Sequence, residues 1–134
     1  MRTKFRRVLE GITPPFINTF GLTACLAAFR DCEDWKKKLL DYLKKNKDIL
    51  YDAVNREMKP LSMGDVEATY LAWIDARGLN IPDPAAFFKQ AGVGLGDGRE
   101  FAAEGFLRMT FACPRSLLLE AIERMKNAVA KRKK

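Results

Sequence analysis

The chain has 134 residues, 48% of them hydrophobic, which is enough for one domain with a packed core and too many for a disordered segment. It has no histidine, and its three cysteines form no Cys-x-x-Cys pair, so the sequence predicts no metal site and favours a reduced, cytoplasmic protein. No apolar run approaches the roughly 20 residues of a membrane-spanning helix, and the basic N-terminus lacks the apolar stretch of a signal peptide.

The formal net charge of +7 raises the question of nucleic-acid binding. Basic residues at 36–38 and 44–45 fall on a predicted amphipathic helix, where they are typical of a solvated face, and those at 131–134 form an expected frayed tail. No aromatic RNA-binding platform or helix-turn-helix pattern accompanies them. We therefore expect neither a nucleic-acid partner nor a membrane partner.

The first 58 residues are predicted to be helical. A short amphipathic helix covers residues 3–10, and after a proline turn at 13–15 a second helix covers residues 16–29. This second helix is apolar nearly all round, which is typical of a central core helix or of a helix that meets a partner. A long helix follows from residue 31 or 32 to about 58, with acidic residues in its first turn and an apolar stripe along one side.

Residues 59–134 are predicted to form a small sheet and a C-terminal helix. Pro60 ends the long helix and allows an edge strand at 59–63, whereas residues 69–74 have the aromatic and β-branched composition of a central strand. A short helix at 85–90 and a glycine-rich strand and turn at 93–98 come next, followed by a loop at 101–104. The glycines are not a phosphate loop, because neither Gly-Lys-Ser/Thr nor a long helix follows them.

Residues 105–116 are predicted to be a strand that runs directly into a helix. Apolar residues alternate with Arg108 and its small neighbours, so one side of the strand is apolar and the other carries a single cation. Pro114 then opens a helix whose apolar residues recur at helical spacing up to residue 129. A guanidinium on a strand face suits bidentate binding of a carboxylate; the alternative is a surface arginine with its stem along the sheet.

The predicted order is three helices, two strands, a helix, two strands and a helix. Because strands and helices do not alternate, the predicted class is α+β: a single domain, residues 1–134, with a small, mainly antiparallel sheet, helices on one face and a long helix before it. Cys113 lacks a histidine base and is predicted to be a small buried hydrophobic residue. Asp75 is expected to cap a turn, and Arg115 to lie on the surface at a helix start.

Residues 106–115, Phe-Leu-Arg-Met-Thr-Phe-Ala-Cys-Pro-Arg, resemble the C-terminal signature of fold-type I pyridoxal-phosphate (PLP) enzymes. The resemblance is to the cystathionine β-lyase and maltose-regulon-modulator branch of the class I/II aminotransferases, which usually has Asn at the position of Thr110. Residues 68–75 are similar to that family's central small-domain strand. Further matching blocks at 18–22, 27–29, 35 and 41–46 occur in order, so the resemblance covers most of residues 4–130.

The resemblance implies a site residue and a missing partner. In the family the arginine of this strand binds the substrate α-carboxylate, which assigns substrate binding to Arg108. The family's Schiff-base lysine, pyridinium partner and phosphate cup lie on a large domain upstream of residue 1, and no Ser-x-x-Lys turn here resembles the family's lysine motif. The resemblance therefore implies no catalytic, cofactor-binding or metal-binding residue on this chain.

We accordingly expect the C-terminal small domain of a PLP-dependent aminotransferase or C–S β-lyase acting on amino acids. Residues 1–58 would form the helical lead-in and interdomain helix, and residues 59–134 the sheet and last helix. The expected partners are the large PLP-binding domain, an amino-acid substrate and a second copy of the chain; alone, the chain is expected neither to bind PLP tightly nor to turn over substrate. The alternative is a stand-alone interaction or regulatory domain that self-associates through residues 16–29.

Overall fold

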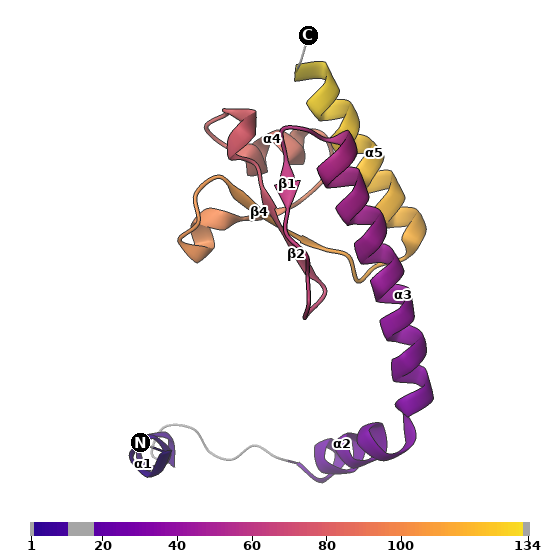
Figure 1. Cartoon of the computed structure of the whole chain (residues 1–134). Coiled ribbons are helices and arrows are strands. Elements are labelled where there is room, and N and C mark those ends of the chain that lie inside the picture. The colour runs from indigo at the N-terminus through magenta and orange to yellow at the C-terminus, as the bar shows by residue number, and fades with distance from the viewer. Residues whose placement is uncertain (1, 11–17, 133–134) are drawn as a thin grey trace. The chain divides into compact units, whose positions relative to one another are not determined.

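The computed structural model of the chain describes residues 2–10 and 18–132, and these divide into two compact units, residues 1–38 and 39–134. Figure 1 shows the order of the elements along the chain. The expected proline turn at 13–15, the first two residues of the expected apolar helix and the last two of the basic tail lie outside the described residues. The single domain over residues 1–134 stays a prediction.

The first unit contains two helices, as the amphipathic and apolar patterns predict. α1 spans Arg2–Glu10 and α2 spans Thr19–Asp31. Asn18 caps α2, because its Oδ1 accepts a hydrogen bond from the Gly21 N–H at 2.7 Å. α2 has no buried residue, and Phe20 and Phe29 are 88% and 86% exposed. The interpretation of this segment as a central core helix is therefore wrong.

The long helix is confirmed, but only its second half is buried. α3 spans Glu33–Asp52, and a π-helical turn over Ala53–Glu57 extends it to the end predicted from the sequence. Along the apolar stripe Trp35 is 65% exposed, whereas Leu50 and Val54 are fully buried. The core contact of this helix thus lies in the second unit.

In the described part of the chain, four strands form an antiparallel sheet. They are β1 (Ser62–Met63), β2 (Leu71–Asp75), β3 (Gly96–Asp97) and β4 (Phe106–Thr110), in the spatial order β1-β2-β4-β3. β1 is an edge strand and β2 an inner strand, as predicted. β2 begins two residues later than predicted because Thr69 has a φ of 68°, a left-handed conformation that an extended strand cannot contain.

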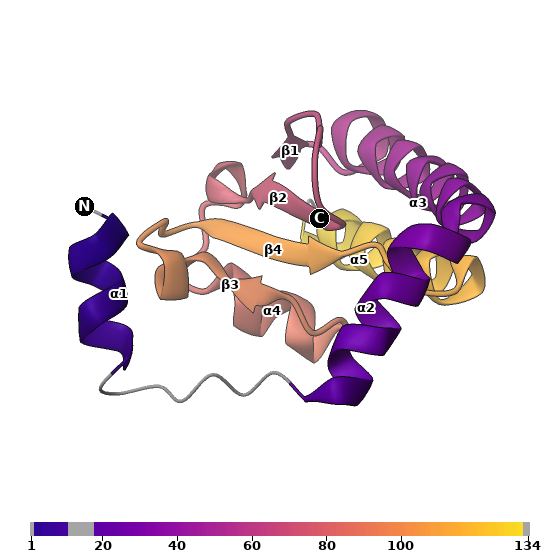
Figure 2. The same ribbon diagram turned by 90° about the horizontal axis from the view of Figure 1, so that it is seen from below.

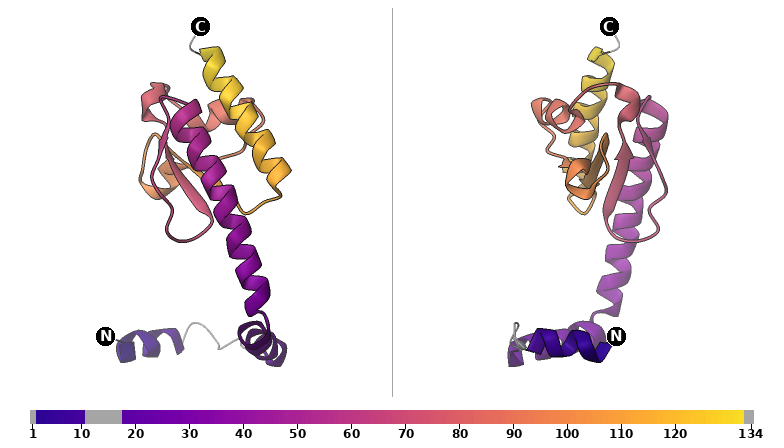
Figure 3. Two further views of the ribbon diagram at one scale, coloured as in Figure 1. Left: turned by 45° about the vertical axis from the view of Figure 1, so that its right-hand side comes forward. Right: turned by 90° about the vertical axis from the view of Figure 1, so that its left-hand side faces the viewer.

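One face of the sheet packs against α3, α4 (Pro84–Gln90) and α5 (Arg115–Arg132). Figures 2 and 3 show α3 and α5 side by side along the sheet. The strands and helices contribute buried residues to one core: Leu50, Val54, Met63, Ala72, Ile74, Phe88, Leu107, Met109, Leu118, Ile122, Met125 and Val129. The predicted α+β class is confirmed.

Two residues of the basic segment 131–134, which was expected to be a frayed tail, are helical. Lys131 and Arg132 belong to α5, and Arg132 donates hydrogen bonds to the carbonyl oxygens of Leu79 and Asn80, each at 3.1 Å. Over the described ranges no helix has the length and apolar character needed to cross a bilayer.

Candidate functional site

Arg108 lies on the face of the sheet that α3, α4 and α5 do not cover, called here the open face. In the register of the sheet Arg108 on β4 stands between Trp73 on β2 and Gly96 on β3. Side chains of paired residues in an antiparallel sheet point to the same face, so Trp73 shares the open face with Arg108. The flanking residues Leu107 and Met109 point into the core, which confirms the alternation predicted for this strand.

Gly96 leaves space beside the arginine side chain. A Cβ atom at this position would lie 3.3 Å from the Arg108 Cβ, closer than ordinary van der Waals contact, and 3.4 Å from its Nε, at the lower limit of such contact. Any larger residue on β3 would therefore press on the Arg108 side chain. The glycine-rich segment predicted as strand and turn thus has a local steric role next to Arg108.

Arg108 is half-buried, and its guanidinium lies over an aromatic ring. Its Cζ atom lies 4.4 Å from the centroid of the Phe101 ring. Within the described residues the guanidinium makes no ion pair and no side-chain hydrogen bond. Because a guanidinium has five N–H donors in one plane, stacking on its face leaves those donors available to a planar anion.

A second arginine on the open face is already paired with a carboxylate. Arg77 lies over the Phe106 ring with its Cζ 4.7 Å from the centroid, and its Nε and Nη2 donate to Asp75 at 3.0 and 2.7 Å. The hydrogen bonds from Arg77 hold the pKa of Asp75 below its usual value. The Asp75 Oδ1 also accepts from the Arg77 backbone N–H, which confirms the predicted turn-capping role.

Trp73 connects the two stacked arginines. Its ring meets the Phe101 ring edge-on at 5.8 Å and 84°, and it stacks on the Phe106 ring at 5.8 Å and 14°. Both distances are within the range of favourable aromatic pairs. The open face is therefore an ordered row of aromatic rings with one arginine at each end, of which only Arg77 has a carboxylate among the described residues.

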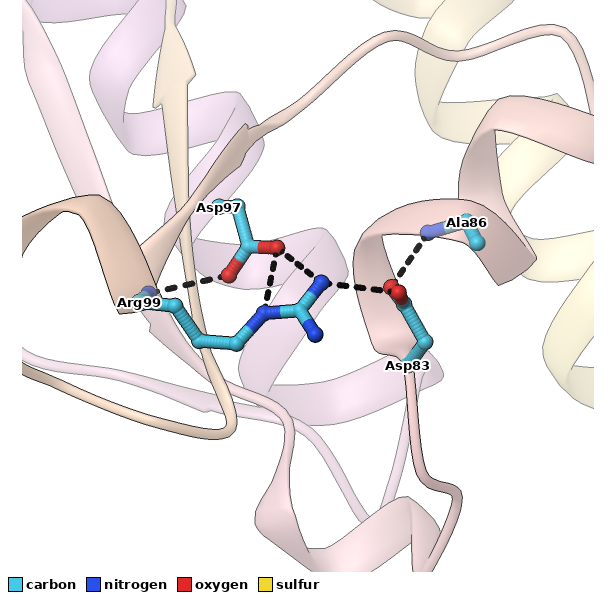
Figure 4. A network of polar contacts seen from close by, with 4 residues as sticks. All are labelled: Asp83, Ala86, Asp97 and Arg99. Carbon is cyan, nitrogen blue, oxygen red and sulfur yellow. Dashed lines mark hydrogen bonds and ion pairs between the residues drawn. The ribbon is translucent and has the colours of Figure 1, made fainter.

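The turn that carries Phe101 is held by a charged network that the sequence did not predict. Gly98–Phe101 form a 3₁₀ turn capped by Asp97, whose Oδ1 accepts from the Arg99 N–H at 2.9 Å. The Arg99 guanidinium bridges Asp97 and Asp83, the residue whose Oδ1 caps α4 by accepting from the Ala86 N–H (Figure 4). The Asp-x-Arg sequence is the only local signal for this arrangement, since Asp83 comes from a segment 16 residues earlier.

These contacts also set the charge state of the network. Arg99 lowers the pKa of Asp97, and the Ala86 N–H followed by Arg99 lowers the pKa of Asp83. Both carboxylates, in turn, raise the pKa of Arg99. The network is therefore fully ionised at neutral pH.

Arg115 does not lie on the surface as predicted. It is half-buried, its Nε donates to the Asn46 Oδ1 at 3.1 Å, and its Cζ lies 4.8 Å from the centroid of the Tyr42 ring. The expectation was wrong because the sequence around the start of α5 contains no sign of a partner on α3, 69 residues away. Cys113 is half-buried and packs against the core, as a small hydrophobic residue does.

Neither half-buried lysine of the described residues has the environment that a Schiff-base lysine requires. Among the described residues only Lys47 and Lys126 are half-buried, and neither lies on a strand. Asp65 raises the pKa of Lys47, and Glu123 and Glu57 raise the pKa of Lys126 to about 12. A lysine must lose its proton to form a Schiff base, so these residues do not fit the lysine attachment of PLP. No cluster of metal-ligating side chains occurs in the described ranges either.

Comparison with known proteins gives one consistent relationship. Residues 4–125 match the family model described as aminotransferase class I and II. Protein MalY of Escherichia coli is 34% identical over 125 residues, which cover 90% of this chain and 32% of MalY. The crystal structure of OvoB superimposes with a TM-score of 0.89 at 43% identity, covering 96% of this chain and 33% of OvoB.

A Corynebacterium diphtheriae protein named as a PLP-dependent β-cystathionase superimposes with a TM-score of 0.80 at 36% identity. The match covers 90% of this chain and 34% of that protein. The chain thus spans about a third of the length of the relatives that it matches.

Proposed function

The chain belongs to the class I and II aminotransferase family, and we propose that its Arg108 binds the α-carboxylate of an amino-acid substrate in a PLP-dependent aminotransferase or C–S β-lyase. The observation that carries this proposal is the guanidinium of the half-buried Arg108, which lies over the Phe101 ring on the open face and has no carboxylate partner among the described residues. Arginine forms short bidentate bonds to carboxylates, and its planar fork gives these bonds a fixed direction.

The role of Arg108 is to orient the substrate. A carboxylate held by two N–H donors fixes one bond of the substrate Cα, which restricts the direction of the other bonds at that carbon. When PLP is bound by the whole enzyme, it supplies the electron sink for the reaction at Cα. Because orientation is common to transamination and β-elimination, the proposal covers both reactions.

We further propose that the lysine, the pyridinium partner and the phosphate cup belong to a large PLP-binding portion, the expected partner of this chain. The lysine environments above support this, since the half-buried lysines are held as charged ion pairs. PLP added to the purified chain and reduced with borohydride should leave no single lysine stoichiometrically modified in a peptide map. A stoichiometric adduct on one lysine would contradict this part of the proposal.

Replacement of Arg108 tests the carboxylate role. The matching third of the C. diphtheriae protein is exchanged for residues 4–125 of this chain, and cystathionine cleavage is followed in the chimera. Arg108→Ala should raise KM by a factor that corresponds to about 2–4 kcal/mol, the usual cost of breaking a buried charge pair. Arg108→Lys should recover only part of this loss, because an ammonium group cannot form the bidentate contact.

Arg77→Ala is the matched control. It removes the other ring-stacked arginine of the open face, but one whose donors are occupied by Asp75. Its KM should stay close to that of the chimera. Equal KM values for the Arg108→Ala and unsubstituted chimeras would refute the role of Arg108. If the chimera does not fold, acetate titration of the 134-residue chain compares the same Arg108→Ala and Arg77→Ala variants with the unsubstituted chain.

A second candidate function, a stand-alone domain that self-associates through α2, is favoured by a different observation. Phe20 and Phe29 on this helix are almost wholly exposed, and Leu22 and Leu26 are more than half exposed. Large apolar side chains exposed together on one helix are a feature of interaction sites. Light scattering on the chain and on a Phe20→Ser/Phe29→Ser variant measures the association. A dimer lost in that variant, together with no effect of Arg108→Ala on carboxylate binding, would favour this second function.

A further inference from the structure

We infer that Phe101 is the positioning residue of Arg108: its ring holds the guanidinium on the open face in the orientation that receives a carboxylate. The inference rests on the carboxylate-binding role proposed for Arg108. It assigns a function to the 3₁₀ turn Gly98–Phe101, which the family resemblance does not explain.

The contact between the two side chains restricts a flexible arginine. The guanidinium carbon lies 4.4 Å from the ring centroid, well within the distance of a cation–π interaction. A ring that contacts the face of a guanidinium leaves its N–H edge free, so a ring and a carboxylate can be bound by one arginine at the same time. A side chain that is already held in one rotamer loses less entropy when its ligand binds.

The other end of the same face provides an internal example of this geometry. Arg77 is stacked on Phe106 at 4.7 Å and at the same time binds Asp75 through its Nε and Nη2. A ring-stacked arginine on this sheet is therefore able to hold a carboxylate through its N–H edge. Arg108 on Phe101 repeats the stacked half of this arrangement, and an external carboxylate would take the place that Asp75 has at Arg77.

Phe101 is itself held in place from two sides. Trp73 supports its ring edge-on at 5.8 Å. The backbone around the turn is packed so closely that a Cβ at Gly98 would lie 2.1 Å from the Ala103 carbonyl oxygen and 2.6 Å from that of Phe106 on β4. On the outer side Arg99 links the turn to Asp83 at the start of α4 (Figure 4). These contacts make the Phe101 ring a fixed support for Arg108.

The test measures the Arg108 side chain directly, by NMR of its Nε–Hε group in the isotope-labelled 134-residue chain. A ring lying over the guanidinium shifts this proton upfield. Phe101→Leu keeps an apolar side chain but removes the ring, so the resonance should move downfield and the Kd for acetate should rise about two- to fivefold. Phe101→Tyr keeps the ring and should retain both values.

Phe106→Leu is the matched control, since it removes the ring under Arg77 and leaves the one under Arg108. It should shift the Arg77 resonance and leave the acetate Kd unchanged. If Phe101→Leu leaves either the Arg108 resonance or the acetate Kd unchanged, the positioning role is overturned. It is also overturned if Phe101→Tyr changes the resonance and the Kd as Phe101→Leu is expected to do. If the unsubstituted chain shows no saturable response of Arg108 to acetate, the proposed carboxylate function itself has failed.

Discussion

Asn46 connects three segments of the fold, and its replacement by alanine should be costly. The residue is fully buried on α3, and its Nδ2 donates to the carbonyl oxygens of Phe111 and Cys113, both at 3.0 Å. Its Oδ1 accepts from the Arg115 Nε at 3.1 Å. These bonds hold the chain between the end of β4 and the start of α5, directly after the strand that carries Arg108.

The expected loss in the free energy of unfolding follows from these three hydrogen bonds. A neutral hydrogen bond contributes about 1 kcal/mol and one to a charged group about 2 kcal/mol, and an unsatisfied buried acceptor adds a desolvation penalty. Because Arg115 and Cys113 are only half-buried, water can replace part of the loss. Asn46→Ala should therefore lower the free energy of unfolding by about 3 kcal/mol.

The assay is urea unfolding followed by circular dichroism, with Asn127→Ala on the exposed side of α5 as the control. The control removes the same amide from a helix surface, where substitutions change stability by less than about 0.5 kcal/mol. If Asn46→Ala and Asn127→Ala had the same midpoint and the same m-value, the three bonds would contribute nothing measurable. The reasoning from buried hydrogen bonds would then be wrong for this site.

Two further predictions concern the turn that carries Phe101. Arg99→Gln should destabilise the chain more at pH 7 than at pH 3, because the lowered pKa values of Asp83 and Asp97 stabilise the fold fully above the unfolded value of about 3.9, and this contribution decreases as the pH falls below that value. An equal urea-midpoint difference at both pH values would contradict this. Gly98→Ala should cost about 3 kcal/mol, since its Cβ would meet the Ala103 carbonyl oxygen at 2.1 Å. Gly94→Ala, with nothing within 4 Å, should cost far less, and equal losses would refute the steric argument.

The strand and helix that frame Arg108 could be predicted because their signals are local. Alternation along β4 and helical spacing along α5 each repeat over several residues, and Leu107, Met109, Leu118 and Ile122 are buried accordingly. The family resemblance adds the role proposed for Arg108, because no local pattern distinguishes this arginine from Arg77.

The surroundings of Arg108 could not be predicted, because they depend on contacts between distant segments. Arg115 turns inward only because Tyr42 and Asn46 lie across from it on α3. Around the Phe101 ring that lies at Arg108, Arg99 joins the turn to Asp83, and Trp73 contacts the ring from β2. Each of these contacts joins residues that share no periodic pattern.

The two units differ in how they use apolar residues, and this difference bears on both candidate functions. Among the described residues, the large side chains that are fully buried all lie in the second unit, whereas Phe20, Phe29 and Trp35 in the first are at least 65% exposed. Fully burying one such side chain contributes about 1.5–3 kcal/mol, so covering all three would contribute several kcal/mol to an association. A large PLP-binding portion and a second copy of the chain would both supply such cover. Exposure of α2 therefore supports a partner without identifying it, and the effect of Arg108→Ala on carboxylate binding is the measurement that separates the two functions.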